Sequence, residues 1–386
     1  MEIIAKIENL KDKIIQIRRH IHMYPDLSGE EKPTRDYVKK ILDNAQIKTK
    51  TFSDNYALVA DILVDENKPF LAFRADMDAL PIQEENHISY ASKKKGIMHA
   101  CGHDAHTAIL TGVMLFLNEY KHLLKTNIRA VFQHKEEVFE GGASELIKEG
   151  VLENVKEIYG LHMYPYLQTG EIGYKYGEMM ASADMFEIEI FGKSAHGARP
   201  HEGVDAILTA SMAVNSINHI VSRRIDPLHP AVISFGTIEG GKAANIICDY
   251  VKLSGTVRTL NDRVRSDIKR MIEDAVGGIV KSMGAEYKFH YYYGNSELIN
   301  SKECVDKVIK AAQTIGAKPI DLATPVMGGE DFAEYLKEVE GAYFRLGCCN
   351  KRKDTCYPQH HPKFNIDEDS LIIGAKILAT LALEEI

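Results

Sequence analysis

Three apolar segments of this chain each end in polar or charged residues, and this arrangement constrains the fold more than any other feature. They read FLAFRADMD from residue 70, NIRAVFQHKEE from residue 127 and IYGLH from residue 158. Short runs that are apolar on both faces are typical of strands buried in a parallel sheet. Together with a helical pattern at about residues 106–120, they predict an α/β domain whose functional groups lie where the strands end.

A different pattern begins near residue 181. The segment FEIEIF at residues 186–191 alternates apolar and charged side chains, which is typical of a half-buried strand. We expect a helix at about 203–222, strands at 231–239 and 250–260, a helix at about 262–282 and a strand at 287–293 to follow. This β-α-β-β-α-β order is that of a ferredoxin-like α+β domain.

The length of 386 residues also favours two domains, because a single core rarely extends that far. We expect residues 1–180 and 294–386 to form the α/β domain and residues 181–293 to be inserted into it. About a hundred residues is a suitable size for an inserted domain.

The net charge of −8 argues against a nucleic-acid or anionic-membrane partner. No segment is apolar over the length needed to span a membrane. Five apolar residues near the N-terminus have helical spacing with charges between them, which is typical of a surface helix and not of an export signal. They are Ile4, Ile7, Leu10, Ile14 and Ile17. We therefore expect a cytoplasmic protein.

Six cysteines are too few for a disulfide scaffold in a chain of this length. Cys101 lies among histidines, which suggests a metal ligand. Cys348, Cys349 and Cys356 lie close together near the C-terminus. A small metal site or a redox pair is possible there, but free thiols in a reducing compartment are the favoured interpretation.

The segment HACGHDAH, residues 99–106, carries the strongest chemical signal. Cys101 and His103 are two residues apart in a glycine-containing turn before a helix, so a thiolate and an imidazole can reach the same metal cluster. Taken alone, a chance histidine-rich turn explains the segment equally well. Asp76, at the end of a buried strand, needs a cation or a histidine to balance its charge.

The remaining signals are weak one at a time. Adjacent glutamates such as Glu136 and Glu137 are common on surfaces, and a single histidine such as His162 or His360 is usually structural. All of them nevertheless fall at predicted strand ends or loops outside the inserted domain. A two-metal hydrolytic site explains this joint pattern, because two cations acidify water and stabilise the oxyanion formed from an attacked carbonyl.

These segments resemble the M20 metallopeptidase family, in particular its amidohydrolase branch of hippurate hydrolases, aminoacylases, auxin-conjugate hydrolases and N-acetyl-diaminopimelate deacetylase. The matching segments occur in family order over nearly the whole chain. They include IRRHIHMYPDLSGEE, FRADMDALPIQEE, MHACGHDAHTAIL, QHKEEVFEGGA, GLHMYPYLQTG, GKSAHGARPHEGVDAI, GTVRTLND, GGEDFAEYL and HHPKFNIDEDSL. The resemblance implies a zinc-peptidase-like α/β catalytic domain with an inserted ferredoxin-like lid and dimerisation domain.

The resemblance also implies residue roles. It implies two divalent metal ions, with zinc, manganese, cobalt or nickel left open, and these ligands: Cys101, His103, Glu137, His162 and His360. Cys101 matches the bridging ligand, Glu136 the general base and Asp76 an acid that orients a ligand or the base region. His360 is chosen over His361 because it fits the family pattern His-x-Pro-x-Phe.

Three residues of the inserted domain match family positions that contact substrate. His196 matches a histidine that stabilises the oxyanion, often from the partner subunit of a homodimer or homotetramer. Asn245 and Arg258 match residues that hold the substrate carboxylate or backbone, a task that suits the planar guanidinium of arginine. Without the resemblance, Arg258 would be taken for a surface ion-pair partner.

The resemblance implies hydrolysis of the amide bond of small-molecule N-acyl amino acids, of the N-acetyl or N-benzoyl type. A dipeptidase or carboxypeptidase on the same scaffold is the nearest alternative; a catalytically silent scaffold protein and a zinc-stabilised structural protein are the others. The chain departs from the branch where Pro-Ala usually precedes the two glutamates, since it has His134 and Lys135 there. We expect the Lys135 side chain to point away from Glu136.

Overall fold

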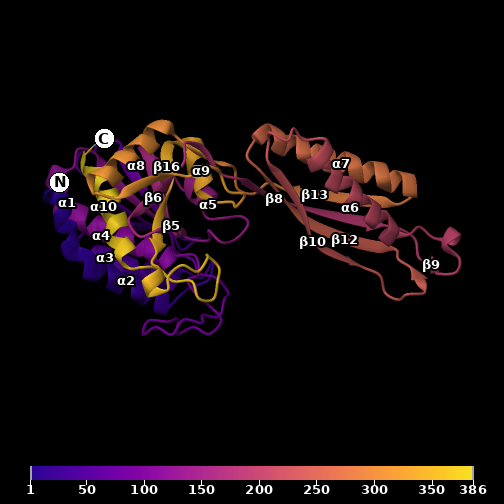
Figure 1. Ribbon diagram of the computed structural model, residues 1–386, viewed down its shortest axis with the longest axis horizontal. Helices are drawn as coiled ribbons and strands as arrows, with labels where there is room; N and C mark the ends of the chain where they lie inside the picture. The colour runs from indigo at the N-terminus through magenta and orange to yellow at the C-terminus, as the bar shows by residue number, and fades with distance from the viewer. Residues whose placement is uncertain (1, 385–386) are drawn as a thin grey trace. The chain divides into compact units, whose positions relative to one another are not determined.

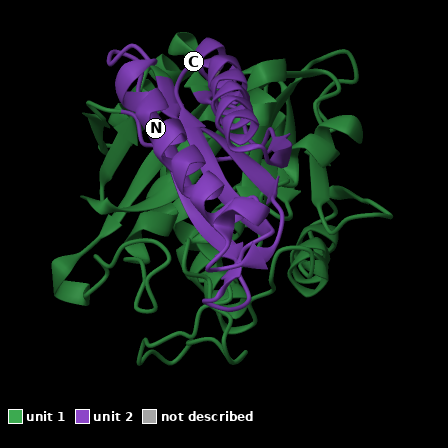
Figure 2. Cartoon of the chain, turned by 90° about the vertical axis from the view of Figure 1, so that its right-hand side faces the viewer, with its two compact units in different colours: residues 1–177, 299–324, 331–386 green, residues 178–298, 325–330 purple. Residues whose placement is uncertain are grey.

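The computed structural model describes residues 2–384, and these divide into two compact units. Unit 1 comprises the described residues up to 177, residues 299–324 and those from 331 onward. Unit 2 comprises residues 178–298 and 325–330 (Figure 2). The chain therefore leaves unit 1 and later returns to it, and the segment 325–330 adds a second, short contribution to unit 2.

Unit 1 is built on an eight-stranded mixed sheet. In spatial order its strands are β1 (Lys48–Thr51), β2 (Leu58–Ile62), β4 (Asn127–Gln133), β3 (Phe70–Asp76), β5 (Val155–Gln168), β16 (Glu340–Cys349), β6 (Glu171–Tyr174) and β15 (Lys318–Asp321). The four central strands β4, β3, β5 and β16 are mutually parallel. They are also the most apolar, with every residue of β3 buried, which confirms the predicted α/β class.

Helices cover both faces of this sheet (Figure 1). They are α1 (Glu2–Ala5), α2 (Lys11–Met23), α3 (Lys32–Asn44), α4 (His103–Glu119), α5 (Ala143–Lys148), α8 (Lys302–Thr314), α9 (Phe332–Glu338) and α10 (Asp369–Glu384), with short 3-10 turns η1 (Lys6–Leu10), η2 (Lys121–Leu123) and η4 (Lys351–Lys353). Helix α4 is the most enclosed: it packs on β3 and is flanked by α2 and α10. The core of the unit is formed by these helices and the central strands.

The apolar residues predicted to line one N-terminal helix do face the core. Ile4, Ile7, Ile14 and Ile17 are buried. The helix is nevertheless interrupted, because η1 tightens the chain between α1 and α2. The spacing of apolar residues indicates which face is buried, but it does not reveal a change from α to 3-10 winding.

Unit 2 has a four-stranded antiparallel sheet in the order β10 (Ala231–Gly240), β12 (Tyr250–Thr259), β8 (Ser182–Phe191) and β13 (Glu286–Tyr292). Helices α6 (Ala206–Arg223) and α7 (Asp262–Met283) pack against one face of it (Figure 1). Strand β8 alternates buried and half-buried residues along its length, as its sequence predicts. Asp205 and Asn261 cap the starts of the two helices, each accepting a backbone N–H.

Smaller elements complete the described structure. The strands β9 (Ala195–His196) and β11 (Ile246–Ile247) pair with each other, and the 3-10 turn η3 (Pro200–Glu202) follows β9. Strands β7 (Gly177–Met180) and β14 (Leu298–Asn300) form a separate two-stranded sheet. Among the described residues, no helix is both long and apolar enough to cross a membrane.

The expectation of free thiols near the C-terminus is wrong for two of the three cysteines. Cys349 forms a disulfide with Cys356, while Cys348 is buried and unbonded. Strand β16 ends at Cys349, and the turn at η4 reverses the chain, which brings the two Cα atoms to 4.6 Å. A separation of seven residues in the sequence does not reveal this reversal.

Candidate metal centre

The turn before α4 places Cys101 and His103 at the start of that helix. Gly102 between them has φ of 98° and a left-handed conformation. A Cβ atom at this position would lie 2.9 Å from the Cβ and Cγ atoms of Met163. Glycine is therefore required both for the backbone conformation and for the close approach of β5. Cys101 and His103 are both buried.

Five sequence-predicted ligands and Glu136 gather in unit 1. Cys101 Sγ lies 3.4 Å from His162 Nε2, and the ligand atoms of Cys101, His103 and His162 lie within 4.8 Å of one another. Those of Cys101, Glu137 and His360 form a second group of the same size. Cys101 belongs to both groups, which is the position that a ligand shared by two cations requires.

The two glutamates lie against His103. His103 Nε2 is 3.8 Å from Glu136 Oε2 and also 3.8 Å from Glu137 Oε1. Glu137 Oε1 is in turn 3.5 Å from His360 Nε2. The carboxylate of Glu137 therefore lies between two imidazoles, and Glu136 lies beside it at the edge of the cluster.

Two buried atoms indicate that the cluster fits a cation. His103 Nε2 and Glu137 Oε1 have no hydrogen-bond partner among the described residues. Leaving a buried polar atom unpaired costs free energy, of the order of 1–3 kcal/mol each. A divalent ion between the imidazole and the carboxylate would give both atoms a partner, and sulfur, imidazole and carboxylate donors are ligands of first-row metals such as zinc.

Asp78 fixes the ring of His103. His103 Nδ1 lies 2.9 Å from the Asp78 carbonyl oxygen and 3.3 Å from its Oδ1. Burial lowers the pKa of His103, but the nearby carboxylates of Asp76 and Asp78 raise it overall, to about 10. Because Nδ1 donates to Asp78, Nε2 is directed towards the ligand cluster.

Asp76 has different short contacts. Its Oδ1 accepts from His106 Nδ1 at 2.5 Å, and its Oδ2 accepts from Arg74 at 2.5 Å and lies 3.8 Å from His103 Nε2. Burial alone would raise the pKa of Asp76, but His103, His106 and Arg74 hold it well below its usual range. Asp76 is thus an anion beside the cluster, while the direct contact to His103 Nδ1 comes from Asp78.

His162 does not end a strand, contrary to the prediction. Strand β5 continues to Gln168, because β16 pairs with it over most of that length. On the other side, pairing with β3 stops at Gly160. His162 therefore lies two residues beyond the last β5 residue that pairs with β3, level with Asp76 at the end of β3.

The ring of His162 is also oriented. Its Nδ1 lies 2.9 Å from the Met163 carbonyl oxygen and 3.0 Å from Gln359 Nε2. Burial, together with His106 and Arg345, holds the pKa of His162 well below its usual value. A neutral imidazole is the form that binds a metal.

The two glutamates follow a turn and not a strand. Strand β4 ends at Gln133, and Lys135 adopts a positive φ of 55°. Its N–H donates to Glu31 Oε1 at 2.9 Å, and its ammonium group lies 3.3 Å from Glu145 Oε1. The chain thus changes direction before Glu136. The Lys135 ammonium group forms an ion pair with Glu145.

His360 also has a positive φ, of 65°, and its N–H donates to the Ala100 carbonyl oxygen. This contact joins the C-terminal loop to the turn that carries Cys101. The neighbouring His361 stacks on Tyr357 and accepts the Lys363 N–H through its Nδ1. The choice of His360 as the candidate ligand therefore agrees with the side-chain contacts.

The three candidate substrate contacts belong to unit 2. His196 is exposed in β9, and the next residue, Gly197, donates its N–H to the Asn245 carbonyl oxygen. His196 and Asn245 therefore lie in one small substructure. Arg258 lies in β12, where its NH1 is 3.1 Å from the Val257 carbonyl oxygen; its strand partner on β8 is Ala183.

Three residues outside the predicted set of site residues contact the candidate ligands. Asp78 and His106 lie in the motifs FRADMDALPIQEE and MHACGHDAHTAIL, but their side-chain contacts depend on which strand meets α4. Gln359 lies next to His360, and no pattern in the sequence marks it as a neighbour of His162.

An α/β unit that gathers sulfur, imidazole and carboxylate groups near the ends of its central strands has the arrangement of a metal-binding hydrolase. The chain belongs to Peptidase family M20/M25/M40, whose sequence profile matches residues 72–384. The resemblance described from the sequence is thereby confirmed.

Named relatives span nearly the whole chain. It is 39% identical to the N-acetyl-L-cysteine deacetylase of Bacillus subtilis (strain 168) over 374 residues, which are 97% of this chain and 88% of that protein. It is 38% identical to thermostable carboxypeptidase 1 of Saccharolobus solfataricus over 393 residues, covering 100% and 99%. The crystal structure of Bacillus subtilis YXEP, described as a dinuclear metal binding peptidase from the M20 family, matches with a TM-score of 0.85 and 32% identity over 98% of this chain and 99% of that one.

Proposed function

We propose that this hydrolase cleaves the amide bond of N-acyl amino acids and releases a carboxylic acid and an amino acid. The observation that carries the proposal is the gathering of the predicted ligands and Glu136 around the buried, unpartnered atoms His103 Nε2 and Glu137 Oε1. The name of the deacetylase relative supports an acyl group on the amino nitrogen.

The proposed ligands of two divalent cations are Cys101, His103, Glu137, His162 and His360, with Cys101 shared between the two ions. When bound, the cations would supply Lewis-acid chemistry, acidifying water and polarising an acyl carbonyl. A thiolate among the ligands favours zinc, while manganese, cobalt and nickel also accept this mixed donor set.

Glu136 is the proposed general base. It lies at the edge of the cluster, with Oε2 3.8 Å from His103 Nε2, where it can take a proton from the attacking water and later give it to the leaving amine. Asp76 is proposed as an anion that holds the surrounding imidazoles in place through His106.

His196, Asn245 and Arg258 are the proposed substrate contacts, and within unit 2 Arg258 lies far from the other two. Arg258 pairs with Ala183 at the start of β8, whereas β9 follows the end of β8. The eight residue steps along β12 from Arg258 to Tyr250, the end near β11, span about 27 Å. If His196 and Arg258 contact one small substrate, they come from two subunits.

A homodimer through unit 2 is therefore part of the proposal, with a homotetramer built from such dimers as the larger alternative. Strand β10 is an edge of the four-stranded sheet, and Val232 and Ile238 on it are exposed. Helix α6 also exposes Ile207, Leu208 and Met212. An open edge strand beside exposed apolar side chains is typical of a surface that a second copy covers. Unit 2 would then serve as lid and dimerisation domain.

A dipeptidase or carboxypeptidase is the second candidate, because one full-length relative is named a carboxypeptidase. The two candidates differ in the free α-amino group and in the acyl group that they accept. Acetyl-, benzoyl- and dipeptide substrates, compared by kcat/KM in protein loaded with each metal in turn, separate them. Preference for a dipeptide with a free amino group would contradict the acylase proposal.

Glu136→Gln tests the base directly, with Glu140→Gln as the matched control in the same loop, where Glu140 is exposed. We expect Glu136→Gln to lower kcat at least 100-fold with metal content unchanged, and Glu140→Gln to leave kcat near that of the unaltered protein. Unaltered kcat in metal-loaded Glu136→Gln protein would remove Glu136 from the mechanism.

A further inference from the structure

The disulfide between Cys349 and Cys356 lies at the base of the loop that carries His360. Strand β16 ends at Cys349, and three residues lie between Cys356 and His360. Within this short segment, Gln359 Nε2 contacts His162 Nδ1, and His360 donates its N–H to Ala100. The segment from Cys356 to His360 thus joins the disulfide to two candidate metal ligands.

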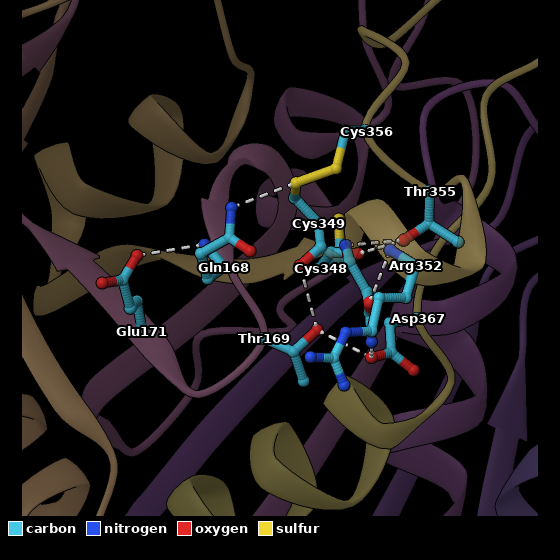
Figure 3. The surroundings of a disulfide bond; sticks show 10 residues. Gln168, Thr169, Glu171, Cys348, Cys349, Arg352, Thr355, Cys356 and Asp367 are labelled. Carbon is cyan, nitrogen blue, oxygen red and sulfur yellow. Dashed lines mark hydrogen bonds between the residues drawn. A yellow bond between two sulfur atoms is a disulfide. The ribbon is translucent and has the colours of Figure 1, made fainter.

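Hydrogen bonds hold the first part of the loop independently of the disulfide. Asn350 N–H donates to Thr355 Oγ1. Thr355 in turn donates to the Cys348 carbonyl oxygen, and Figure 3 shows these two residues side by side. Lys353 and Asn350 also contact Asp367. The turn at residues 350–355 would therefore persist if the disulfide were opened.

The second part of the loop has fewer hydrogen bonds of its own, and the disulfide ties its start at Cys356 to β16. Beyond Cys356, the segment is held by the contact of Gln359 with His162, the contact of His360 with Glu137 and the bond from the His360 N–H to Ala100. Tyr357 also stacks on His361. A cross-link limits the conformations available to the segment next to it. Opening this one would let residues 356–360 move away from His162.

The surroundings of the disulfide favour thiol exchange. Cys356 is partly exposed, whereas Cys349 is 4% exposed. Gln168 Nε2 lies 3.2 Å from Cys349 Sγ, and Figure 3 shows its amide directed at that sulfur. The side chains of Lys351 and Arg352, two and three residues after Cys349, are exposed. A hydrogen-bond donor and positive charge stabilise a departing thiolate.

We propose that Cys349 and Cys356 form a reversible redox modification site that takes a dithiol as reductant and sets the position of Gln359 and His360. A thiolate of the dithiol attacks Cys356 Sγ, the bond between the two protein sulfurs breaks, and Cys349 leaves as a thiolate. The second thiol of the reductant then attacks the mixed disulfide and releases Cys356. The dithiol becomes a disulfide, and the protein gains two electrons and two protons.

Cys348 does not compete in this exchange, although it adjoins Cys349. It is buried, and burial raises the pKa of its thiol far above the usual value. A buried thiol that stays protonated is a poor nucleophile. The pair Cys349–Cys356 therefore opens and closes without a third cysteine resolving it.

The first test counts thiols in protein denatured without reductant and again after treatment with a phosphine. The structure assigns Cys101, Cys248, Cys304 and Cys348 as unbonded, so we expect four thiols before reduction and six after it. Six thiols before reduction, unchanged by a mild disulfide-forming oxidant such as diamide, would overturn the proposal.

The second test measures the loop itself. Hydrogen exchange of residues 356–361 is compared in oxidised protein, phosphine-reduced protein and the double variant Cys349→Ser/Cys356→Ser, with Cys248→Ser in unit 2 as the control. We expect exchange at least tenfold faster in the reduced and double-variant proteins only, reversed when the disulfide re-forms. Equal exchange in all four proteins would overturn the proposal, and equal melting temperatures would exclude general unfolding as the cause.

The expected effect of disulfide reduction on metal binding rests on the proposed metal centre. Zinc affinity, measured by competition with a chromogenic chelator, should fall about tenfold on reduction, the lower end of the loss seen when a group that orients a ligand is removed. If neither redox form binds zinc, manganese, cobalt or nickel, the proposed metal centre fails while the exchange test still decides the redox site. If metal binds equally in both forms, the control of His360 by the disulfide is refuted.

Discussion

Asp78 contacts the imidazole of His103 at two atoms, its backbone carbonyl oxygen at 2.9 Å and its Oδ1 at 3.3 Å. Its other oxygen, Oδ2, accepts from Ser28 Oγ and from the Glu137 N–H. One carboxylate therefore links the ring of one candidate ligand to the backbone of another. Through its bond to Asp78, Ser28 connects the segment that follows α2 to the ligand cluster.

Asp78→Asn should weaken metal binding by about 10- to 100-fold, because it removes the negative charge 3.3 Å from His103 Nδ1 and the charged oxygen that accepts from Ser28 and the Glu137 N–H. Zinc affinity by chelator competition is the measurement. Asp54→Asn, at an exposed position, is the control and should bind as the unaltered protein does. Equal affinity of the two variants would show that Asp78 does not orient His103.

Gly102→Ala should destabilise the protein by about 3 kcal/mol or more, from a left-handed backbone and a clash with Met163 together. Gly170 separates the two causes, since its φ is 96° but no atom lies within 4 Å of an added Cβ. Gly170→Ala should cost only about 1–2 kcal/mol. Urea unfolding of metal-free protein measures the loss of unfolding free energy in each variant. Equal losses would mean that the clash with Met163 does not contribute to the destabilisation of Gly102→Ala.

Glu31 should make stability depend on pH. Burial raises the pKa of Glu31 to about 7 from its usual 4.5, although the backbone N–H groups of Gly29 and Lys135 donate to it. A raised folded pKa means that folding favours the protonated form, so stability is greatest below 4.5 and falls as pH rises from 4.5 to about 7.

Glu31→Gln should remove that fall, which amounts to about 3 kcal/mol at most. The free energy of unfolding of metal-free protein, measured between pH 4.5 and 8, is compared with that of Glu30→Gln, whose side chain is exposed. If Glu31→Gln shows the same pH profile as Glu30→Gln, the carboxyl of Glu31 titrates normally in the folded protein.

Asp184→Asn should destabilise unit 2 by about 3–5 kcal/mol, because it leaves the charge of buried Arg265 without its partner. Asp184 accepts from Arg265 and from the Tyr291 hydroxyl, and is fully buried. Asp267, in an exposed pair with Arg270 at 2.9 Å, is the matched control. Asp267→Asn should change stability by less than about 1 kcal/mol, and similar losses in the two variants would contradict the assignment of a buried pair.

Much of the fold follows from local pattern. The apolar part of the segment NIRAVFQHKEE is β4, and the alternation in FEIEIF is the inward and outward alternation of β8. Strand bounds are less predictable where pairing decides them. His162 lies within β5 because β16 extends the pairing past it, and the partner strand comes from the other end of the chain.

The contacts between the residues of the candidate site were less predictable from the sequence than the identity of those residues. Cys101 and His103 stand out because their spacing suits a metal, but Asp76 and Asp78 are equivalent in the sequence. Which of them meets His103 depends on how α4 packs on β3. The disulfide between Cys349 and Cys356 depends likewise on a chain reversal at η4.

The sequence by itself determined the class of fold, the family and the set of residues able to bind metal, because side-chain chemistry and the spacing of apolar residues are local properties. Only the tertiary structure decided that Asp78 orients His103, that Gln359 contacts His162 and that a cross-link precedes His360. The first two contacts join residues that are distant in the chain, and the cross-link depends on the chain reversal at η4. All three distances are set by the packing of strands, helices and turns that no local pattern specifies.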